Sequence, residues 1–434
     1  MSRPLFLISA RQAPSRRSAA AIASVLALGL MTAMPALAED ASADAAASWT
    51  QWGGADQSFQ APSGKLKTSW PETGPPKLWE RDLGEGYSAV LVQDGKLYTQ
   101  FRADEKEWVI ALDAASGKTL WEKSYEASPT EGHVDQFGRG PRATPLLLDD
   151  RLYTIGVSGV MHCLDKKTGD VKWKLDLWKD MGGSFLNHGY SSSPVAYGDQ
   201  LIVLVGGEDQ AFVSLNQSDG KVKWKSGSFK NSYSTPRFFE VGGKDHMVTF
   251  MAGEIVGMDP ATGTVDWTYE IQNQWGQNIN MPVLVDGESL FFSTPQGGAR
   301  GVKLTRKDGK VHAEEQWSTR KIQLYHVTSV LLGDHVYSST GTGSPSFMAS
   351  VNVKTGEINW RKRGFGKANL LEADGKLIIL DENGELYLAE PSPEDLKVLD
   401  QAKVLDRPAW TVPTLVGTTL YVRGNGKLKA LNLG

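Results

Sequence analysis

Short apolar runs separated by turn residues fill the body of the chain, and no stretch there has the periodicity of a helix. In ATPLLLDDRLYTIG (143–156), an apolar strand, an Asp turn and a second alternating strand follow one another. The same pattern recurs in SSPVAYGDQLIVLVG (192–206), VTSVLLGDHVYSSTG (327–341) and TVPTLVGTTLYVRG (411–424). Each of these segments predicts a β-hairpin.

A second motif follows the hairpins and adds two more strands to each unit. It has an Asp or Asn eight residues before a Trp and a Gly four residues before that Trp, as in LDKKTGDVKW (164–173). The five clear copies end at Trp121, Trp173, Trp224, Trp267 and Trp360, and stretched or partial copies end at Trp79 and Trp317. Units of about 42 to 52 residues with four strands each are typical of β-propeller blades.

The number of units predicts a closed ring. Seven complete units reach to about Lys403, and the eighth, which ends at Gly434, lacks its last strand. Lys77–Leu83 has the sequence of that missing strand. We therefore expect an all-β fold, an eight-bladed propeller of four-stranded antiparallel blades in which the N- and C-terminal strands pair and leave no free edge.

The first 38 residues have the pattern of a cleavable signal peptide, with four arginines, an apolar run over 18–34 and an Ala-Leu-Ala cleavage site at 36–38. A membrane anchor is the alternative, but the run is short and ends in Pro35. Arg16-Arg17 leaves open whether export is general or twin-arginine. We expect a signal peptide at 1–38, a spacer and N-terminal extension at 39–74, and the propeller at 75–434. The mature protein would then be periplasmic or secreted and have no transmembrane anchor.

Cysteine content and charge narrow the classes of partner. Cys163 is the only cysteine, so the chain has no intramolecular disulfide, and no cysteine near residue 38 could carry a lipoprotein anchor. Without residues 1–38 the chain has 42 basic and 50 acidic side chains, a balance that argues against nucleic-acid binding. We expect a monomer.

The Ala/Leu-x-Asp-x-x-Thr-Gly-x-x-x-Trp motif resembles the tryptophan-docking repeat of the quinoprotein alcohol dehydrogenase-like propellers, named for pyrroloquinoline quinone (PQQ), and the resemblance covers residues 75–434. WTQWGGADQSF (49–59) is similar to the opening of many exported bacterial PQQ-repeat proteins. That superfamily includes PQQ-dependent dehydrogenases and non-enzymatic members such as BamB of the outer-membrane assembly machinery. The resemblance implies the fold and leaves the function open, because the motif is a packing device.

Candidate functional residues precede the first strand of each unit, at one mouth of the central channel. Alignment of the units predicts a ring of Tyr87, Arg142, Ser191, Tyr233, Ile279, His326, Lys367 and Trp410, with His188, Tyr190, Asn278, Asn280 and Tyr325 beside it. One interpretation is that these side chains only pack between blades. The other is a funnel of aromatic and cationic groups for a planar or anionic ligand, such as PQQ, an acidic sugar or a peptide carboxylate.

Three classes of function remain open at this point. We favour a binding or scaffold module in the bacterial envelope, with a small ligand or an envelope protein as partner. The alternative is a PQQ-dependent alcohol or sugar dehydrogenase, which would need PQQ and calcium. Against it, Cys163 has no partner for the adjacent-cysteine disulfide of such enzymes, there is no haem-attachment motif, and no carboxylate lies in the ring. A hydrolase or lyase using His188 or His326 as base and Tyr87, Tyr190 or Tyr233 as acid is less favoured. The histidines show no spacing of metal ligands.

Overall fold

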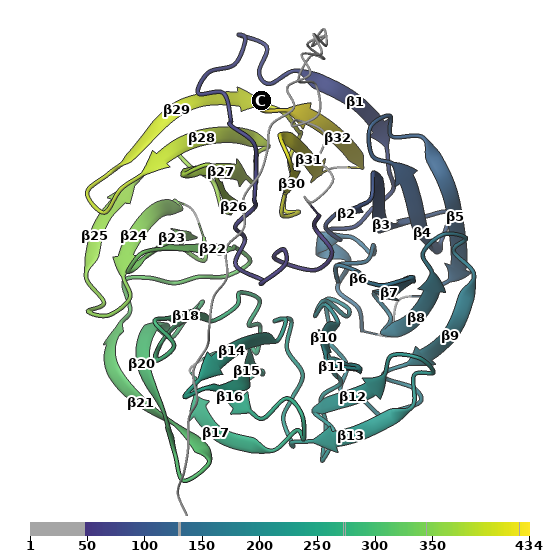
Figure 1. The fold of residues 1–434 in the computed structure, drawn as a ribbon, viewed down its shortest axis with the longest axis vertical. Coiled ribbons are helices and arrows are strands. Elements are labelled where there is room, and N and C mark those ends of the chain that lie inside the picture. Colours follow the sequence, from purple (N-terminus) through teal and green to yellow (C-terminus); the bar gives the residue numbers. More distant parts are fainter. Residues whose placement is uncertain (1–47, 129–131, 272, 274, 344, 425) are drawn as a thin grey trace, which may run out of the picture. The chain divides into compact units, whose positions relative to one another are not determined.

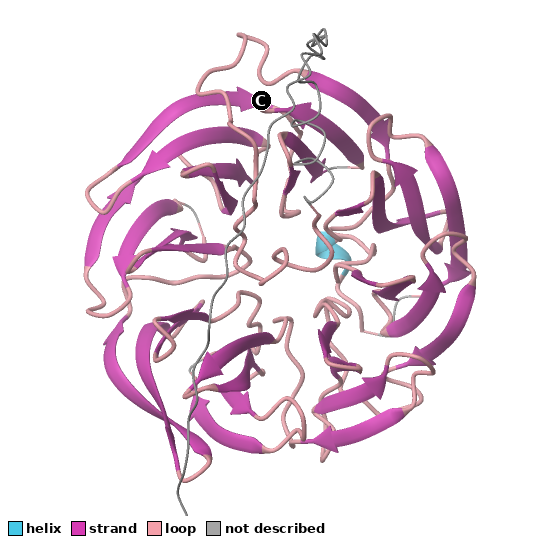
Figure 2. Ribbon diagram, viewed as in Figure 1, coloured by secondary structure: helices cyan, strands magenta, loops and turns pink. Residues whose placement is uncertain are grey.

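The computed structural model describes residues 48–434 except 129–131, 272, 274, 344 and 425. The predicted signal peptide and the spacer up to residue 47 lie outside these residues. Within them, β-strands form eight four-stranded antiparallel sheets around a common centre, with one 3-10 turn, η1 (Asp135–Phe137) (Figures 1 and 2). The prediction of an all-β, eight-bladed propeller is confirmed.

In seven blades, four consecutive strands pair in order from the axis outward. Blade 1 contains β2 (Leu91–Gln93), β3 (Lys96–Ala103), β4 (Lys106–Asp113) and β5 (Thr119–Glu126); blade 2 contains β6 (Leu146–Leu148), β7 (Arg151–Ile155), β8 (Val160–Asp165) and β9 (Val171–Asp176). Blade 3 contains β10 (Val195–Tyr197), β11 (Gln200–Leu204), β12 (Phe212–Asn216) and β13 (Val222–Ser226); blade 4 contains β14 (Arg237–Val241), β15 (Lys244–Phe250), β16 (Glu254–Met258) and β17 (Val265–Glu270).

The remaining consecutive blades follow the same plan. Blade 5 contains β18 (Val283–Val285), β19 (Ser289–Thr294), β20 (Gly298–Lys307) and β21 (Lys310–Thr319). Blade 6 contains β22 (Ser329–Leu332), β23 (His335–Thr340), β24 (Phe347–Asn352) and β25 (Ile358–Lys362). Blade 7 contains β26 (Ala368–Ala373), β27 (Lys376–Asp381), β28 (Glu385–Pro391) and β29 (Leu396–Lys403).

The eighth blade joins the two ends of the propeller. Its strand order is β1-β32-β31-β30, with β1 (Lys77–Asp82), β30 (Thr414–Val416), β31 (Thr419–Gly424) and β32 (Lys427–Asn432). β1 pairs antiparallel with β32, from Lys77 opposite Leu431 to Asp82 opposite Lys427. Lys77–Leu83 therefore supplies the missing outer strand, as the sequence predicted.

The repeated Gly and Trp residues form contacts between neighbouring blades. The Trp121 indole Nε1 donates to the backbone oxygen of Lys166 in blade 2 at 3.0 Å, and its ring lies against Gly169. Gly169 has a φ of +73°, and a Cβ added to it would lie 2.5 Å from Trp121 Cε3. The same pairing of a Trp with the Gly of the next blade occurs for Trp79 with Gly117, Trp173 with Gly220, Trp224 with Gly263 and Trp317 with Gly356.

Blade 4 departs from this arrangement because blade 5 lacks the receiving turn. The hairpin of β20 and β21 is long, and a Cβ added to Gly309 at its turn would have no neighbour within 4 Å. Trp267 instead donates from Nε1 to His246 Nε2 of its own blade at 3.0 Å.

Residues 49–67, called here the axial segment, cross the centre of the ring (Figure 1). Trp49 pairs with Val92 in both directions, at 2.8 and 2.9 Å. Further hydrogen bonds join the segment to other blades: Thr50 to Leu147, Gln57 to Pro236, Gln60 to Leu331, Phe59 and Ala61 to Glu372, and Lys67 to Leu433. Trp49, Phe59, Ala61 and Leu66 also belong to the largest apolar cluster. Among the described residues, no helix has the length and apolar character needed to span a bilayer.

Candidate ligand-binding cavity

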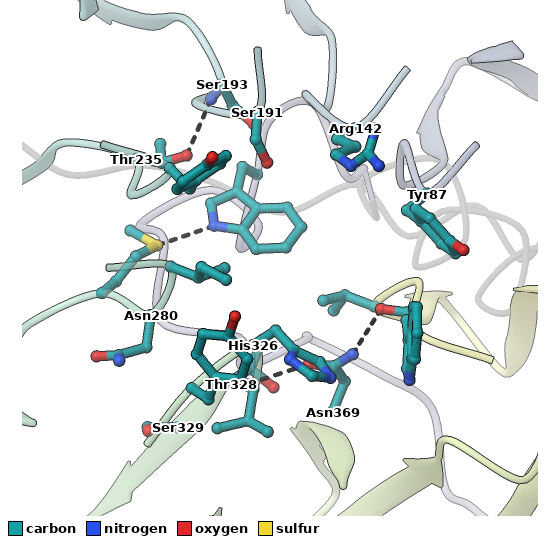
Figure 3. A pocket seen from close by; sticks show the side chains of 18 of the residues that line it. Tyr87, Arg142, Ser191, Ser193, Thr235, Asn280, His326, Thr328, Ser329 and Asn369 are labelled. Atoms are coloured by element: carbon teal, nitrogen blue, oxygen red, sulfur yellow. Dashed lines mark hydrogen bonds between the residues drawn. The ribbon is translucent and has the colours of Figure 1, made fainter. Parts of the chain in front are cut away.

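A cavity of about 170 Å³ lies at the centre of the propeller, between the axial segment and the residues that lead into the innermost strands (Figure 3). Eight of the eleven residues proposed from the sequence line it: Tyr87, Arg142, His188, Tyr233, Asn280, Tyr325, His326 and Trp410. Ser191 and Ile279 of the predicted ring line it too. The alignment of the blades therefore brings together side chains from positions about 40 to 55 residues apart.

Three proposed residues lie outside the lining. The Tyr190 side chain is fully buried, with its ring 6.1 Å from that of Trp178. Successive side chains of an extended chain point to opposite sides, so Tyr190 points into the core while Ser191 lines the cavity. Asn278 is buried and donates from Nδ2 to the backbone oxygen of Met251 at 2.8 Å.

Lys367 is the third of these residues. Its backbone oxygen accepts a hydrogen bond from the Glu382 N–H at 2.7 Å. In this blade the cavity is lined by Asn369, two residues further along the chain.

Other lining residues were not predicted, although a sequence signal existed for some of them. Ser193 follows Ser191 by two positions, and Thr235 and Arg237 follow Tyr233 by two and four. Side chains at alternate positions share a face in extended chain, so the ring positions could have been continued inward. Phe137 is in a long loop outside the repeat, and Trp52 and Phe59 come from the axial segment.

An aromatic cluster centred on Trp410 occupies one side of the cavity. The Trp410 ring lies 5.5 Å from Tyr87, 5.5 Å from Phe137 and 5.3 Å from His326, measured between ring centroids. Trp410 precedes blade 8, Tyr87 precedes blade 1, and His326 precedes blade 6. Phe137 lies in the connection between blades 1 and 2. On the axial segment, Trp52 and Phe59 meet edge to face at 5.5 Å.

The charged groups of the cavity are two arginines, and no Asp or Glu is among its lining residues within the described chain. Arg142 donates to the backbone oxygens of Gly140, Phe137 and Gly138 at 3.1–3.2 Å. Arg237 donates from Nη1 to the backbone oxygen of Pro282 at 3.2 Å. Neither arginine forms an ion pair with any residue that the structure describes.

Burial determines the protonation of the cavity at neutral pH. It lowers the pKa of Arg237 to about 10 and also lowers the pKa of Arg142, but both guanidinium groups stay charged near pH 7. Burial, with a smaller contribution from Lys367, lowers the pKa of His326 to about 3. Burial, followed by the charge of Arg142, also lowers the pKa of His188. The cavity therefore presents two cations and neutral imidazoles.

Four buried polar atoms of the lining have no hydrogen-bond partner within the described part of the chain. They are His188 Nδ1, Arg237 Nε, His326 Nε2 and Asn280 Oδ1. Buried polar groups in folded proteins are nearly always paired, so these atoms indicate where a ligand or ordered water would bind.

The lining does not fit calcium-bound PQQ. Calcium takes six to eight oxygen ligands, usually including carboxylates, whereas the lining offers amide, hydroxyl and backbone oxygens only. Across the residues that the structure describes, no three His, Cys, Asp or Glu side chains are grouped as metal ligands.

Of the three tyrosines considered as catalytic acids, Tyr190 is buried in the core outside the cavity. Tyr87 lines the cavity with its ring 5.5 Å from that of Trp410, and Tyr233 donates from Oη to Asn187 Oδ1 at 2.7 Å. The hydrogen bond of Tyr233 is made to an amide and not to an imidazole, so it gives no support to a pairing of this tyrosine with a histidine base.

Comparison with known proteins places these features in a family. A family model described as outer membrane protein assembly factor BamB matches residues 105–362. The BamB protein of Shewanella oneidensis is 22% identical over 303 residues, which cover 65% of this chain and 71% of that protein.

Solved structures share the fold. A europium-containing methanol dehydrogenase superimposes with a TM-score of 0.66 at 13% identity and covers 87% of this chain and 89% of that one. BamB from Moraxella catarrhalis superimposes with a TM-score of 0.54 at 16% identity, over 83% of this chain and 100% of that one. At these identities the likeness concerns architecture, which enzymes and assembly factors share.

Proposed function

Since this chain belongs to the family of the outer membrane protein assembly factor BamB, we propose that it is an exported propeller that acts as a protein-binding scaffold in the bacterial envelope. The observation that carries the proposal is the family match over residues 105–362, which runs from blade 1 to blade 6. The proposal includes export through a signal peptide at 1–38 and no lipid anchor, because Cys163 is the only cysteine of the sequence.

Exposed aromatic side chains on the loops between blades offer a surface for a protein partner. Phe185 lies in the loop before β10 and is 38% exposed, and Trp275 lies in the loop before β18 and is 49% exposed. The Trp275 ring is 6.0 Å from that of Tyr325, which lines the cavity, so this exposed indole borders the mouth. Aromatic residues are enriched in protein interfaces.

The role in outer-membrane protein assembly can be tested in a strain that lacks this protein. We expect a reduced content of outer-membrane proteins, restored by the wild-type chain and restored less by a Phe185→Ser/Trp275→Ser variant. Val171→Ser is the matched control, because Val171 is 53% exposed on the outer strand β9, away from these loops. A normal outer-membrane protein content in the deletion strain would contradict the proposed function.

The shared fold keeps a PQQ-dependent dehydrogenase as the second candidate. The absence of carboxylates from the described cavity lining argues against it. Calorimetric titration of the purified protein with PQQ, with and without calcium, separates the two. We expect no binding heat in either condition, whereas calcium-dependent PQQ binding together with alcohol oxidation would place the dehydrogenase first.

A further inference from the structure

The two arginines give the cavity a charge that its lining does not balance. Moving a cation out of water is costly unless an anion or a set of hydrogen bonds compensates it. Arg423, a fully buried arginine outside the cavity lining, shows the compensated case: its guanidinium donates to the backbone oxygens of Ser88 and Gln100, each at 2.8 Å, and to Thr99 Oγ1.

Arg237 has fewer hydrogen bonds than Arg423, and the charge of Asp56 on the axial segment offsets only part of the effect of burial, since the pKa of Arg237 is still lowered to about 10. Its Nη1 has one backbone acceptor, Pro282, and its Nε is buried without a partner in the described chain. The guanidinium carbon lies 5.3 Å from the centroid of Phe239, so an aromatic ring supports the group. A planar anion could accept from the guanidinium edge, because arginine presents its donors in a fork that matches a carboxylate.

Arg142 supplies the second cation from another part of the lining. Three backbone carbonyls fix its guanidinium, and its Cζ lies 5.8 Å from the centroid of Tyr87. In Figure 3 its side chain and that of Tyr87 lie on the same side of the cavity. A cation held in place by carbonyls adds attraction for an anion without needing to rearrange.

The rest of the lining suits a flat apolar body. Trp410 with its neighbours forms one wall, and Trp52 and Phe59 of the axial segment and Met281 before β18 contribute further apolar surface. An engineered cavity of about 150 Å³ in another protein holds one benzene molecule, so about 170 Å³ accommodates an acid built on a single ring. His326 Nε2 and Asn280 Oδ1 remain to bind a polar substituent.

We propose that this cavity binds an organic carboxylate with a single-ring aromatic body, that Arg237 and Arg142 neutralise its charge, and that the Trp410 cluster holds its ring without calcium. The inference goes beyond the scaffold role and does not rest on it. The carboxylate could belong to a free aromatic acid or to the C-terminus of a peptide that ends in an aromatic residue, since both present the same chemistry.

The test compares acids with their neutral amides on the wild-type chain. Phenylacetate and benzoate, each beside its amide, are titrated calorimetrically in a buffer that contains EDTA. A tripeptide ending in Phe is titrated as the free acid and as the amide. We expect each amide to bind at least about tenfold more weakly than its acid, since a hydrogen bond to a charged group contributes about 1.5–3 kcal/mol. The tighter of the two acid classes identifies the source.

A variant then assigns the anion partner. Arg237→Gln should weaken binding of the acids by about tenfold or more and leave binding of the amides unchanged. The matched control is Arg151→Gln, because Arg151 lies outside the cavity lining and donates to the backbone oxygens of Gln217 and Ser218. Equal affinity of acids and amides, no binding of either, or a requirement for calcium would overturn the proposal. The comparison of acids with amides uses the wild-type chain, so it still tests the proposal if Arg237→Gln does not fold.

Discussion

Substituting the glycine at a junction between blades should destabilise the protein through two effects that can be separated. In Gly169→Ala, the alanine must adopt the left-handed backbone conformation of Gly169, with a φ of +73°. Its Cβ would lie 2.5 Å from Trp121 Cε3. The indole cannot easily retreat, because its Nε1 is bonded to the Lys166 oxygen at 3.0 Å.

The two effects differ in their expected size. The left-handed conformation costs an alanine roughly 1–2 kcal/mol. Inserting a methyl group into a packed contact costs roughly a further 1–3 kcal/mol. We therefore expect Gly169→Ala to lower the free energy of unfolding by about 2–5 kcal/mol, measured by urea denaturation.

Gly309→Ala is the matched control, because Gly309 also has a positive φ, +82°, but its Cβ would meet nothing within 4 Å. It should cost only the conformational part, about 1–2 kcal/mol. A Gly169→Ala variant that is no less stable than Gly309→Ala would refute the packing role of the repeated glycine.

Other consequences of the structure can be measured in the same way. Trp79→Ala removes a buried indole from the strand that closes the ring and should cost about 3–5 kcal/mol in urea; a loss below about 1 kcal/mol would mean that closure does not depend on it. The pKa of His326 is about 3 in the folded protein and 6.5 as the ordinary value, so its contribution to stability is complete above pH 6.5 and is lost as the pH falls toward 3. Wild type should therefore lose more stability than His326→Gln between pH 7 and pH 4, and parallel pH profiles would contradict this. Trp52→Ala should weaken binding of phenylacetate while the chain stays folded by circular dichroism, and an unchanged affinity would remove the axial segment from the site.

The fold was predictable because the propeller repeats one physical device. At five junctions a Trp covers the Gly of the next blade, and both residues must recur at a fixed spacing for the blades to pack. The same regularity fixed the register of the innermost strands, which is why Tyr87, Arg142 and Trp410 reach one cavity. Whether they bind a ligand remains a prediction.

Cavity residues that lie outside the repeated units could not be predicted from the repeat. Trp52 and Phe137 enter the cavity from segments that belong to no blade, so no alignment of units could place them. Tyr190 shows the sensitivity to register, since one step along the chain separates a cavity-facing side chain from a core-facing one. Arg237 could have been predicted, because side chains two residues apart share a face in an extended chain and Arg237 follows Tyr233 by four positions.

The axial segment changes the way in which this repeat protein should unfold. A chain of units that contact only their neighbours can lose structure from any position, one unit at a time. Here residues 49–67 bond to blades 1, 2, 4, 6 and 7 and to the chain directly after β32. A strand that links distant units turns a one-dimensional array into a cross-connected network, in which the loss of one blade strains several others. Heat and denaturant should therefore melt the ring in a single concerted transition.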